Sequence, residues 1–143
     1  MRNLKKKASS RPVIGVSSFE LHLLPGRMAI CRLDPSQEPP AWAGSGVLSS
    51  VTRTPAEMTV VCPEENVPAG ITCNKNWLGL RIAADLDFSE TGILSSLVAP
   101  LAAERVPVYL LSTYSMDLIL VKEEDLSRAV LALSEAGHRV CLP

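Results

Sequence analysis

The stretch DLDFSETGILSSLVAPLAAERVPVYLLSTYSMDLILVK, residues 85–122, decides the fold of this chain. Across residues 90–105, apolar residues recur at the i, i+1, i+4, i+5 spacing, which predicts a helix with one apolar face. They are Ile93, Leu94, Leu97, Val98 and Leu101. Residues 106–111 and 118–121 are short apolar runs, and they predict two buried strands joined by a loop over residues 113–117.

The predicted start of this helix and the loop between the two strands outline a pocket. Ser89 is the expected N-cap, and Glu90 follows in the first turn, where the helix dipole favours an anion. If the two strands flank the helix on one sheet, the loop that ends at Asp117 lies beside this first turn. Free backbone N–H groups would then face a carboxylate and carbonyl oxygens.

Two residues of the predicted helix are unusual. Gly92 falls in its first turn, where glycine costs roughly 1 kcal/mol relative to alanine. We therefore expect the fold to tolerate valine at this position, while a ligand that approaches the backbone closely would be blocked. Pro100 removes the hydrogen bond to the carbonyl of Ser96. The alternative interpretation of both residues is a slightly bent core helix with tolerated small residues.

The second half of the chain follows a β-α-β-β-α-β order. Residues 77–86 predict the strand before the central helix. Residues 123–136 predict a last amphipathic helix that Gly137 ends, and residues 140–142 predict a closing strand. This order is the split βαβ pattern of ferredoxin-like folds.

The first half predicts a reduced version of the same order, with a weak first helix. Residues 19–24 and 28–33 predict strands, and Pro25-Gly26 between them predicts the tight turn of a hairpin. The later elements are one helical turn at residues 40–44, strands at 47–53 and 58–62, a short helix at 63–67 and a connector at 71–76.

The composition is that of an ordinary globular protein. The 143 residues give material for one domain or for two small ones that share a core. Apolar residues make up 47%, charged residues 20%, and the net charge is −1. A clustered basic surface is missing, and aromatic residues at 4% provide no stacking platform for single strands. No apolar run approaches the roughly 18 residues of a membrane helix. Neither nucleic acid nor a membrane is therefore an expected partner.

The N-terminal residues and the cysteines carry little functional signal. Residues 1–16 are basic with little to bury, so we expect a disordered tail, with a nuclear or organellar signal as the alternative. Their apolar run, residues 12–16, is too short for the core of a signal peptide. The cysteines lack CxxC spacing and fall mostly in strand-like contexts, so free buried thiols in a reducing compartment are favoured over disulfides or metal. They are Cys31, Cys62, Cys73 and Cys141.

The residues give little support to catalysis, to a metal site or to a cofactor. His22 and His138 lie far apart in the sequence, and neither adjoins a nucleophile motif. His22 fits a partly exposed strand position, whereas His138 complements the dipole at a helix C-terminus. The acidic triplet at residues 123–125 opens a helix, where acids are favoured by the same dipole. No phosphate-binding loop or dinucleotide fingerprint occurs. We expect no enzyme, no cofactor and no bound metal.

Several separated motifs occur in an order that a known family shares. In the second half they are Phe88-x-x-x-Gly92-Ile-Leu, Ala99-Pro-Leu-Ala102, and Leu111-Ser-Thr-Tyr114-x-x-Asp117 with its continuation to Asp125. In the first half they are Leu23-Leu-Pro-Gly26, Ser50-Val-Thr-Arg-Thr-Pro55 with Glu57, and Val60-Val-Cys-Pro-Glu64. Over residues 19–140 the chain thus resembles the ACT-domain family of small regulatory, amino-acid-binding modules. Its likeness is greatest to the branch of short tandem-ACT proteins related to the cytosolic arginine sensors.

The resemblance implies an α+β fold of two tandem ACT units, each ferredoxin-like (βαββαβ), of which the first is reduced. The expected division is a basic tail over residues 1–16, the first unit over 17–70 and a complete second unit over 71–143. It also implies a cytoplasmic, non-catalytic regulatory protein that binds a free amino acid or a similar small metabolite at an ACT–ACT interface and controls a protein partner. The alternative is a ligand-free structural or adaptor protein that acts through dimerisation.

The relatives' pocket implies ligand contacts from two facing units. One unit would supply the helix start and the loop, through Ser89, Glu90, Thr91, Gly92, Ile93, Thr113, Tyr114 and Asp117. The facing unit would supply Ser96, Leu97 and Val98 from its own central helix.

Both facing units are implied to be second units, from two copies of the chain. The arginine sensors carry four ACT units in one chain, whereas this chain has two, and its first half lacks the Gly-Ile-Leu and Ser-Thr-Tyr motifs. The resemblance therefore implies a homodimer. Asp117 is the expected counter-charge for a cationic group of the ligand, with a turn-capping role as the alternative.

Overall fold

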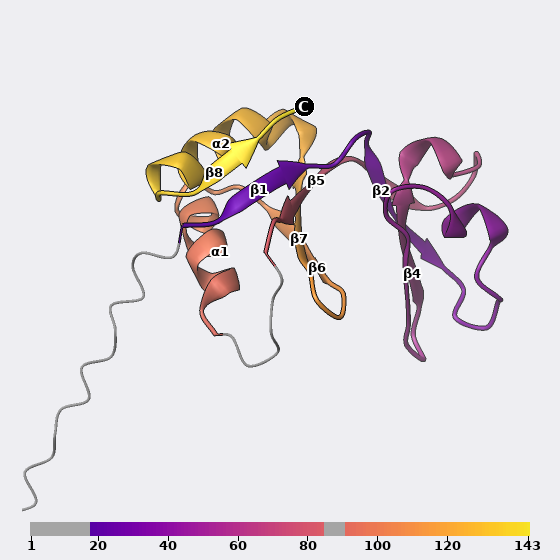
Figure 1. Ribbon diagram of the computed structural model, residues 1–143. Coiled ribbons are helices and arrows are strands. Elements are labelled where there is room, and N and C mark those ends of the chain that lie inside the picture. Colours follow the sequence, from indigo (N-terminus) through magenta and orange to yellow (C-terminus); the bar gives the residue numbers. More distant parts are fainter. Residues whose placement is uncertain (1–17, 85–90) are drawn as a thin grey trace, which may run out of the picture.

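The computed structural model describes residues 18–84 and 91–143, and the strands of these residues form one eight-stranded sheet (Figure 1). The strands are β1 Glu20–Leu23, β2 Met28–Leu33, β3 Ser50–Arg53, β4 Met58–Pro63, β5 Cys73–Ile82, β6 Val108–Ser112, β7 Asp117–Lys122 and β8 Arg139–Cys141. Two α-helices, α1 Ile93–Ala103 and α2 Leu126–Glu135, occur together with the 3-10 turns η1 Ala41–Gly44, η2 Glu64–Asn66 and η3 Glu123–Asp125. Among the described residues, no helix is both long and apolar enough to cross a membrane.

Strand β5 joins two parts of this sheet. Its first half pairs with β2, and its second half lies between β1 and β7, so that Leu80 is opposite Leu23 on one side and Ile119 on the other. The two parts have the orders β3-β4-β2-β5 and β8-β1-β5-β7-β6. We call the second part the helix-covered sheet, because both α-helices pack against it (Figure 1).

The predicted hairpin between the first two strands is wrong. Strands β1 and β2 do not pair with each other; both run antiparallel to β5, one after the other. The backbone N–H of Leu24 still donates to the carbonyl of Gly79 (2.8 Å), so the chain stays on β5 as it passes Pro25-Gly26. Gly26, at a φ of 78°, makes a kink rather than a reversal. The chain thereby passes from β1 in the helix-covered sheet to β2 in the other part, while it remains paired with β5.

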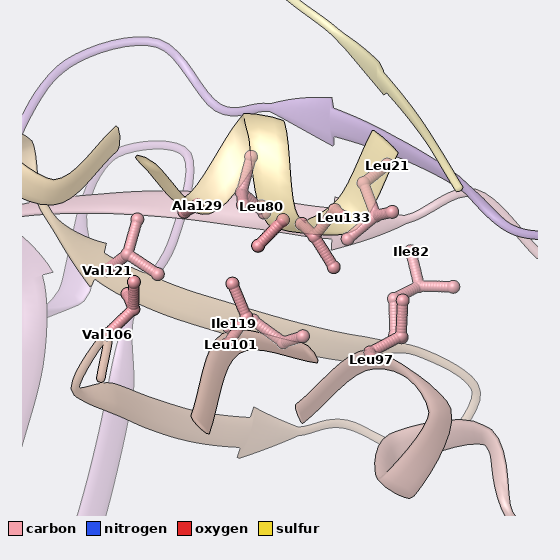
Figure 2. Packing of buried hydrophobic residues seen from close by; sticks show 11 residues of the cluster. Leu21, Leu80, Ile82, Leu97, Leu101, Val106, Ile119, Val121, Ala129 and Leu133 are labelled. Carbon is pink, nitrogen blue, oxygen red and sulfur yellow. The ribbon is translucent and has the colours of Figure 1, made fainter. Parts of the chain in front are cut away.

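Both helices bury their apolar faces against one side of the helix-covered sheet. Leu97 and Leu101 of α1 and Leu133 of α2 are fully buried, which confirms the face predicted from the spacing of α1. Figure 2 shows these side chains meeting those of the strands. The strand residues of this core are Leu21, Leu80, Ile82, Ile119 and Val121. Because these side chains are inaccessible to water, each leucine of the layer is worth about 2–5 kcal/mol against alanine.

The first half of the chain has the reduced form expected of it. Between residues 18 and 84, the described residues form strands and two 3-10 turns, with no α-helix. Its small core contains Cys31 and Cys62, and Ala43 of η1 covers it. The predicted connector at residues 71–76 is wrong, because β5 already begins at Cys73. Asn76, at a φ of 64°, lies where the pairing of β5 with β2 shifts register, so this polar stretch is an irregular part of the strand. The fold as a whole is α+β with a ferredoxin-like, helix-covered half.

His138 follows the end of α2, as predicted, but it is buried and bonds to two other parts of the chain, which the sequence did not indicate. Its side chain is 6% exposed; Nδ1 accepts a hydrogen bond from the Phe19 backbone N–H (3.1 Å), and Nε2 lies 3.1 Å from the Ser96 carbonyl oxygen. Pro100 has no N–H to offer that carbonyl. The imidazole therefore takes the place of the missing helical bond, as the tautomer with its proton on Nε2. It ties α1 to the start of β1 and to the chain after α2.

Candidate ligand-binding site

The first component of the candidate site is the N-terminal end of α1, where Gly92 is the N-cap. The helix begins at Ile93, later than the predicted residue 90, and Gly92 is its N-cap, with a φ of 79°. Ser89 is therefore not the N-cap of this helix, and Gly92 does not lie in its first turn. At this φ a β-branched residue is strained, so the reason given for tolerance of Gly92→Val, a place in the first helical turn, is wrong. The Gly92 carbonyl accepts bonds from Ser96 N (3.0 Å) and Ser95 Oγ (2.9 Å), which fixes the first turn.

The second component is the hairpin between β6 and β7, which confirms the two predicted strands. Its loop closes through a bond from the Thr113 N–H to the Met116 carbonyl (2.8 Å). Asp117 lies on β7, opposite Ser112 of β6, and its Oδ1 accepts a hydrogen bond from the Ser112 hydroxyl (2.5 Å). The carboxylate is half-buried and has a cross-strand partner, while the neighbouring Tyr114 is 83% exposed.

The topology puts the two components at the same end of the helix-covered sheet. The C-terminal end of β5 pairs with the start of β7, through Arg81 and Leu118, next to the hairpin loop. Figure 1 shows the start of α1 and the tip of the β6–β7 hairpin toward the same end of the strands. Ser89 and Glu90, which were predicted to complete this site, lie outside the described residues.

The residues predicted to contact a ligand from the facing unit follow the helix start. Ser96 is half-buried, and its hydroxyl donates to the Ile93 carbonyl (2.7 Å). Val98 is half-buried as well, whereas the Leu97 side chain is fully buried in the core. Leu97 can thus reach a ligand only through its backbone. Thr91, on the other side of Gly92, is exposed.

Two residues of the acidic triplet after β7, Glu123 and Asp125, form ion pairs with arginines. Arg27 binds Glu123 with two nitrogens, at 2.6 and 3.1 Å, and this hydrogen-bonded pair lowers the pKa of the Glu123 carboxyl. Asp125 pairs with Arg128 at 2.5 Å. Beside the Arg27–Glu123 pair, a cleft of about 780 Å³ lies at the junction of the two parts of the sheet. Its lining carries both charge signs, from Arg27, Lys75, Glu64, Glu65 and Glu123.

Sequence reasoning missed one cluster of side chains. Glu20, His22 and Cys141 bring a carboxylate, an imidazole and a thiol within 4.8 Å of one another on strands β1 and β8. The i, i+2 spacing of Glu20 and His22 in a strand is a readable signal that they share a face. The position of Cys141 is not readable, because the pairing of β8 with β1 cannot be inferred from the local pattern.

Comparisons with known proteins match both halves of the chain. The profile described as the ACT domain matches residues 72–135, and one described as an N-terminal domain matches residues 26–70. Human cytosolic arginine sensor for mTORC1 subunit 1 is 36% identical over 97 residues, or 60% of this chain and 30% of the sensor. The crystal structure of protein Atu0741 from Agrobacterium tumefaciens superposes with a TM-score of 0.85 at 32% identity, covering 90% of this chain and 96% of that one.

Residues 72–135 belong to the ACT-domain family. Within it, the chain is related to the cytosolic arginine sensors, of whose length it spans less than a third. A lower-identity neighbour shares the fold alone: the regulatory subunit of aspartate kinase from Thermus thermophilus has a TM-score of 0.58 at 12% identity and covers 81% of this chain and 95% of its own. The predicted α+β, ferredoxin-like ACT fold is confirmed. Nothing in these likenesses assigns a ligand to the ACT residues described above.

Proposed function

We propose that this protein is a small cytoplasmic, non-catalytic regulator that binds a free amino acid between the second ACT units of two copies of the chain. The observation that carries the proposal is the pairing of a helix N-terminus with a carboxylate at one end of the sheet. Backbone N–H groups at a helix start favour a carboxylate. Asp117 favours an ammonium or a guanidinium group. A free amino acid carries both kinds of charge, and the likeness to the arginine sensors makes arginine the first ligand to test.

The homodimer is proposed because the site faces outward. Strand β6 pairs only with β7 among the described strands, so its other edge is open. Leu110 on that strand is 41% exposed, and Tyr114 in the following loop is 83% exposed. A second ACT unit seated there would bury these side chains and supply its own Ser96 and Val98 to the ligand. A two-fold symmetric interface would form two such sites.

A thermal-shift screen of the twenty amino acids, followed by calorimetric titration of the hits, tests the function. A ligand that binds only the folded protein stabilises it by RT ln(1 + [L]/Kd), about 2.7 kcal/mol at a hundredfold excess over Kd. Light scattering with and without the hit gives the oligomeric state, with a dimer expected. If no amino acid stabilises the protein and it still forms a dimer, a structural or adaptor role replaces the sensor role.

The role of Asp117 is tested by Asp117→Asn, with Ser112→Ala as its matched control. The asparagine keeps an oxygen for the Ser112 hydroxyl but loses the charge, whereas Ser112→Ala loses the same hydrogen bond and keeps the charge. A charge-assisted bond of about 1.5–3 kcal/mol predicts roughly ten- to over a hundredfold weaker binding for Asp117→Asn. We expect Ser112→Ala to bind nearly as the wild type does.

The mixed-charge cleft at the junction of the sheet is the other place for such a ligand, and Glu65→Gln reports on it. If Glu65→Gln weakens the titrated affinity while Asp117→Asn leaves it unchanged, the ligand binds in the cleft. In that case the amino-acid proposal stands, but its placement between two ACT units is wrong.

A further inference from the structure

Strands β1 and β8 hold three metal-binding side chains on the face of the sheet opposite the helices. Leu21 and Val140 point into the helix-covered core, so their neighbours in each strand point to the other face. Glu20 and His22 occupy that face of β1, and Cys141 lies on β8 directly opposite His22 in the parallel register. The donor atoms all lie within 4.8 Å of one another, and His22 Nε2 is 2.7 Å from Glu20 Oε1.

We propose that Glu20, His22 and Cys141 form a zinc-binding site. Thiolate, imidazole and carboxylate are the ligands that zinc takes in proteins, at about 2.3, 2.0 and 2.0–2.2 Å. A tetrahedral ion with these bonds requires donors about 3.3–3.6 Å apart. Side chains already within 4.8 Å reach that separation by small rotations. The thiolate argues against magnesium or calcium, which prefer oxygen ligands.

The backbone around these three residues is fixed, while their side chains remain accessible. The Glu20 carbonyl accepts from Ala83 N (2.8 Å), and Arg139 N donates to the Phe19 carbonyl (2.9 Å), so both strands are held where the ligands project. The side chains of His22 and Glu20 are 40% and 44% exposed. An ion can therefore enter from solvent and keep a fourth position for water or for a group of another molecule.

Two local charges act on an incoming ion in opposite directions. The Glu20 carboxylate, whose Oε1 lies 2.7 Å from His22 Nε2, attracts a cation. The Arg139 guanidinium lies 3.9 Å from Glu20 and repels a cation, but its side chain is 77% exposed and can turn away into water. On binding, the Cys141 thiol releases its proton to solvent, and the coordinating nitrogen of His22 must be free of its proton, as metal ligation requires.

A bound ion would fasten the last strand to the sheet. Strand β8 has three residues and pairs only with β1 among the described strands. A Cys141–metal–His22 bridge would cross this pair, so that zinc stabilises the folded chain according to its concentration over Kd. This site is independent of the amino-acid site proposed above, since it uses other residues and another ligand.

Cobalt titration of the reduced, chelator-treated full-length protein tests the site. Tetrahedral Co²⁺ bound to a thiolate gives a near-ultraviolet charge-transfer band and visible d–d bands, and one equivalent of Zn²⁺ should abolish them. We expect Cys141→Ser to lose the charge-transfer band. We expect His22→Ala to weaken cobalt binding by about 100-fold or more, since loss of even an outer-shell partner costs 10–100-fold.

Cys73→Ser is the matched control, because Cys73 is the other half-buried cysteine and lies outside this cluster. It should keep the cobalt spectrum, and zinc should raise the thermal midpoint of wild type and Cys73→Ser but not that of Cys141→Ser. Absence of a stoichiometric cobalt spectrum in the wild type would overturn the proposal. A charge-transfer band that survives Cys141→Ser and disappears in Cys73→Ser would overturn it equally.

Discussion

Replacing His138 by alanine should destabilise the protein more than replacing any other polar side chain of comparable size. The substitution leaves two backbone groups without their partner, the N–H of Phe19 and the carbonyl of Ser96, each now bonded at 3.1 Å. An unsatisfied buried polar group costs about 1–3 kcal/mol. The two together give a loss of roughly 2–6 kcal/mol. The packing of the ring on Phe19, whose centroid lies 5.8 Å away, adds to this loss.

Urea unfolding followed by tryptophan fluorescence measures this loss, since Trp77 is only 8% exposed and reports on the folded state. The matched control is His22→Ala. In the metal-free protein the His22 ring hydrogen-bonds to the exposed Glu20 side chain, so its removal should change stability by about 0.5 kcal/mol or less. Both variants replace an imidazole by a methyl group, but His138 is buried and His22 is partly exposed.

A double-mutant cycle with Pro100→Ala separates the Ser96 bond from the rest of the His138 effect. Alanine at position 100 supplies the N–H that the helix lacks, so the Ser96 carbonyl no longer depends on the imidazole. In the Pro100→Ala background, His138→Ala should therefore cost about 1 kcal/mol less than in the wild type. The reasoning is refuted if His138→Ala unfolds at the same urea concentration as His22→Ala. It is refuted equally if His138→Ala loses the same free energy of unfolding in the wild-type and Pro100→Ala backgrounds.

Three further predictions follow from individual residues. Gly92→Ala should lose about 1 kcal/mol of stability and Gly92→Val more, in urea unfolding, because both side chains must adopt the left-handed backbone of the α1 N-cap; equal stability of all three proteins would contradict that conformation. The Arg27 bond lowers the pKa of Glu123 below 4.5, so the stability that this bond contributes is present above pH 4.5 and is lost as the pH falls through the folded pKa. The thermal midpoint of Arg27→Gln should therefore fall less on acidification than that of the wild type. Burial raises the pKa of the Cys31 thiol to about 12, so iodoacetamide at pH 8 should label the half-buried Cys73 and Cys141 before Cys31, and mass spectrometry that finds Cys31 labelled first would show that its strand opens.

The parts of the fold that depend on local periodicity could be predicted from the sequence. Leu97 and Leu101 recur at helical spacing and are both buried in α1, and the apolar runs around Tyr109 and Leu120 form the hairpin β6–β7. In each case the signal and the structure are formed within one element. The helix boundary was placed too early because Ser89 and Glu90 look like a cap and a first turn, whereas a left-handed glycine sets the start.

Contacts between distant residues could be predicted only in part. The sequence shows that Pro100 leaves the Ser96 carbonyl without its helical partner, but nothing near either residue indicates that an imidazole from position 138 replaces it. The same holds for Asp117, whose charge is visible in the sequence and whose bond to Ser112 depends on the register of β6 and β7. Which side chains meet is set by the pairing of strands, and that pairing is a property of the whole sheet.

The placement of β1 shows how much one such pairing determines. In the order β8-β1-β5, β1 fills a gap of two strand spacings, about 9.5 Å, between the last strand and β5. Its Leu21 is fully buried with Leu80 and Ile82, so residues 20–23 complete the core of a unit whose other strands begin at residue 73. Phe19, just before this segment, donates its N–H to His138, and the segment itself carries two of the three proposed zinc ligands. Sequence position alone would assign it to the first unit, but the physical unit formed by packing and hydrogen bonds includes it in the second.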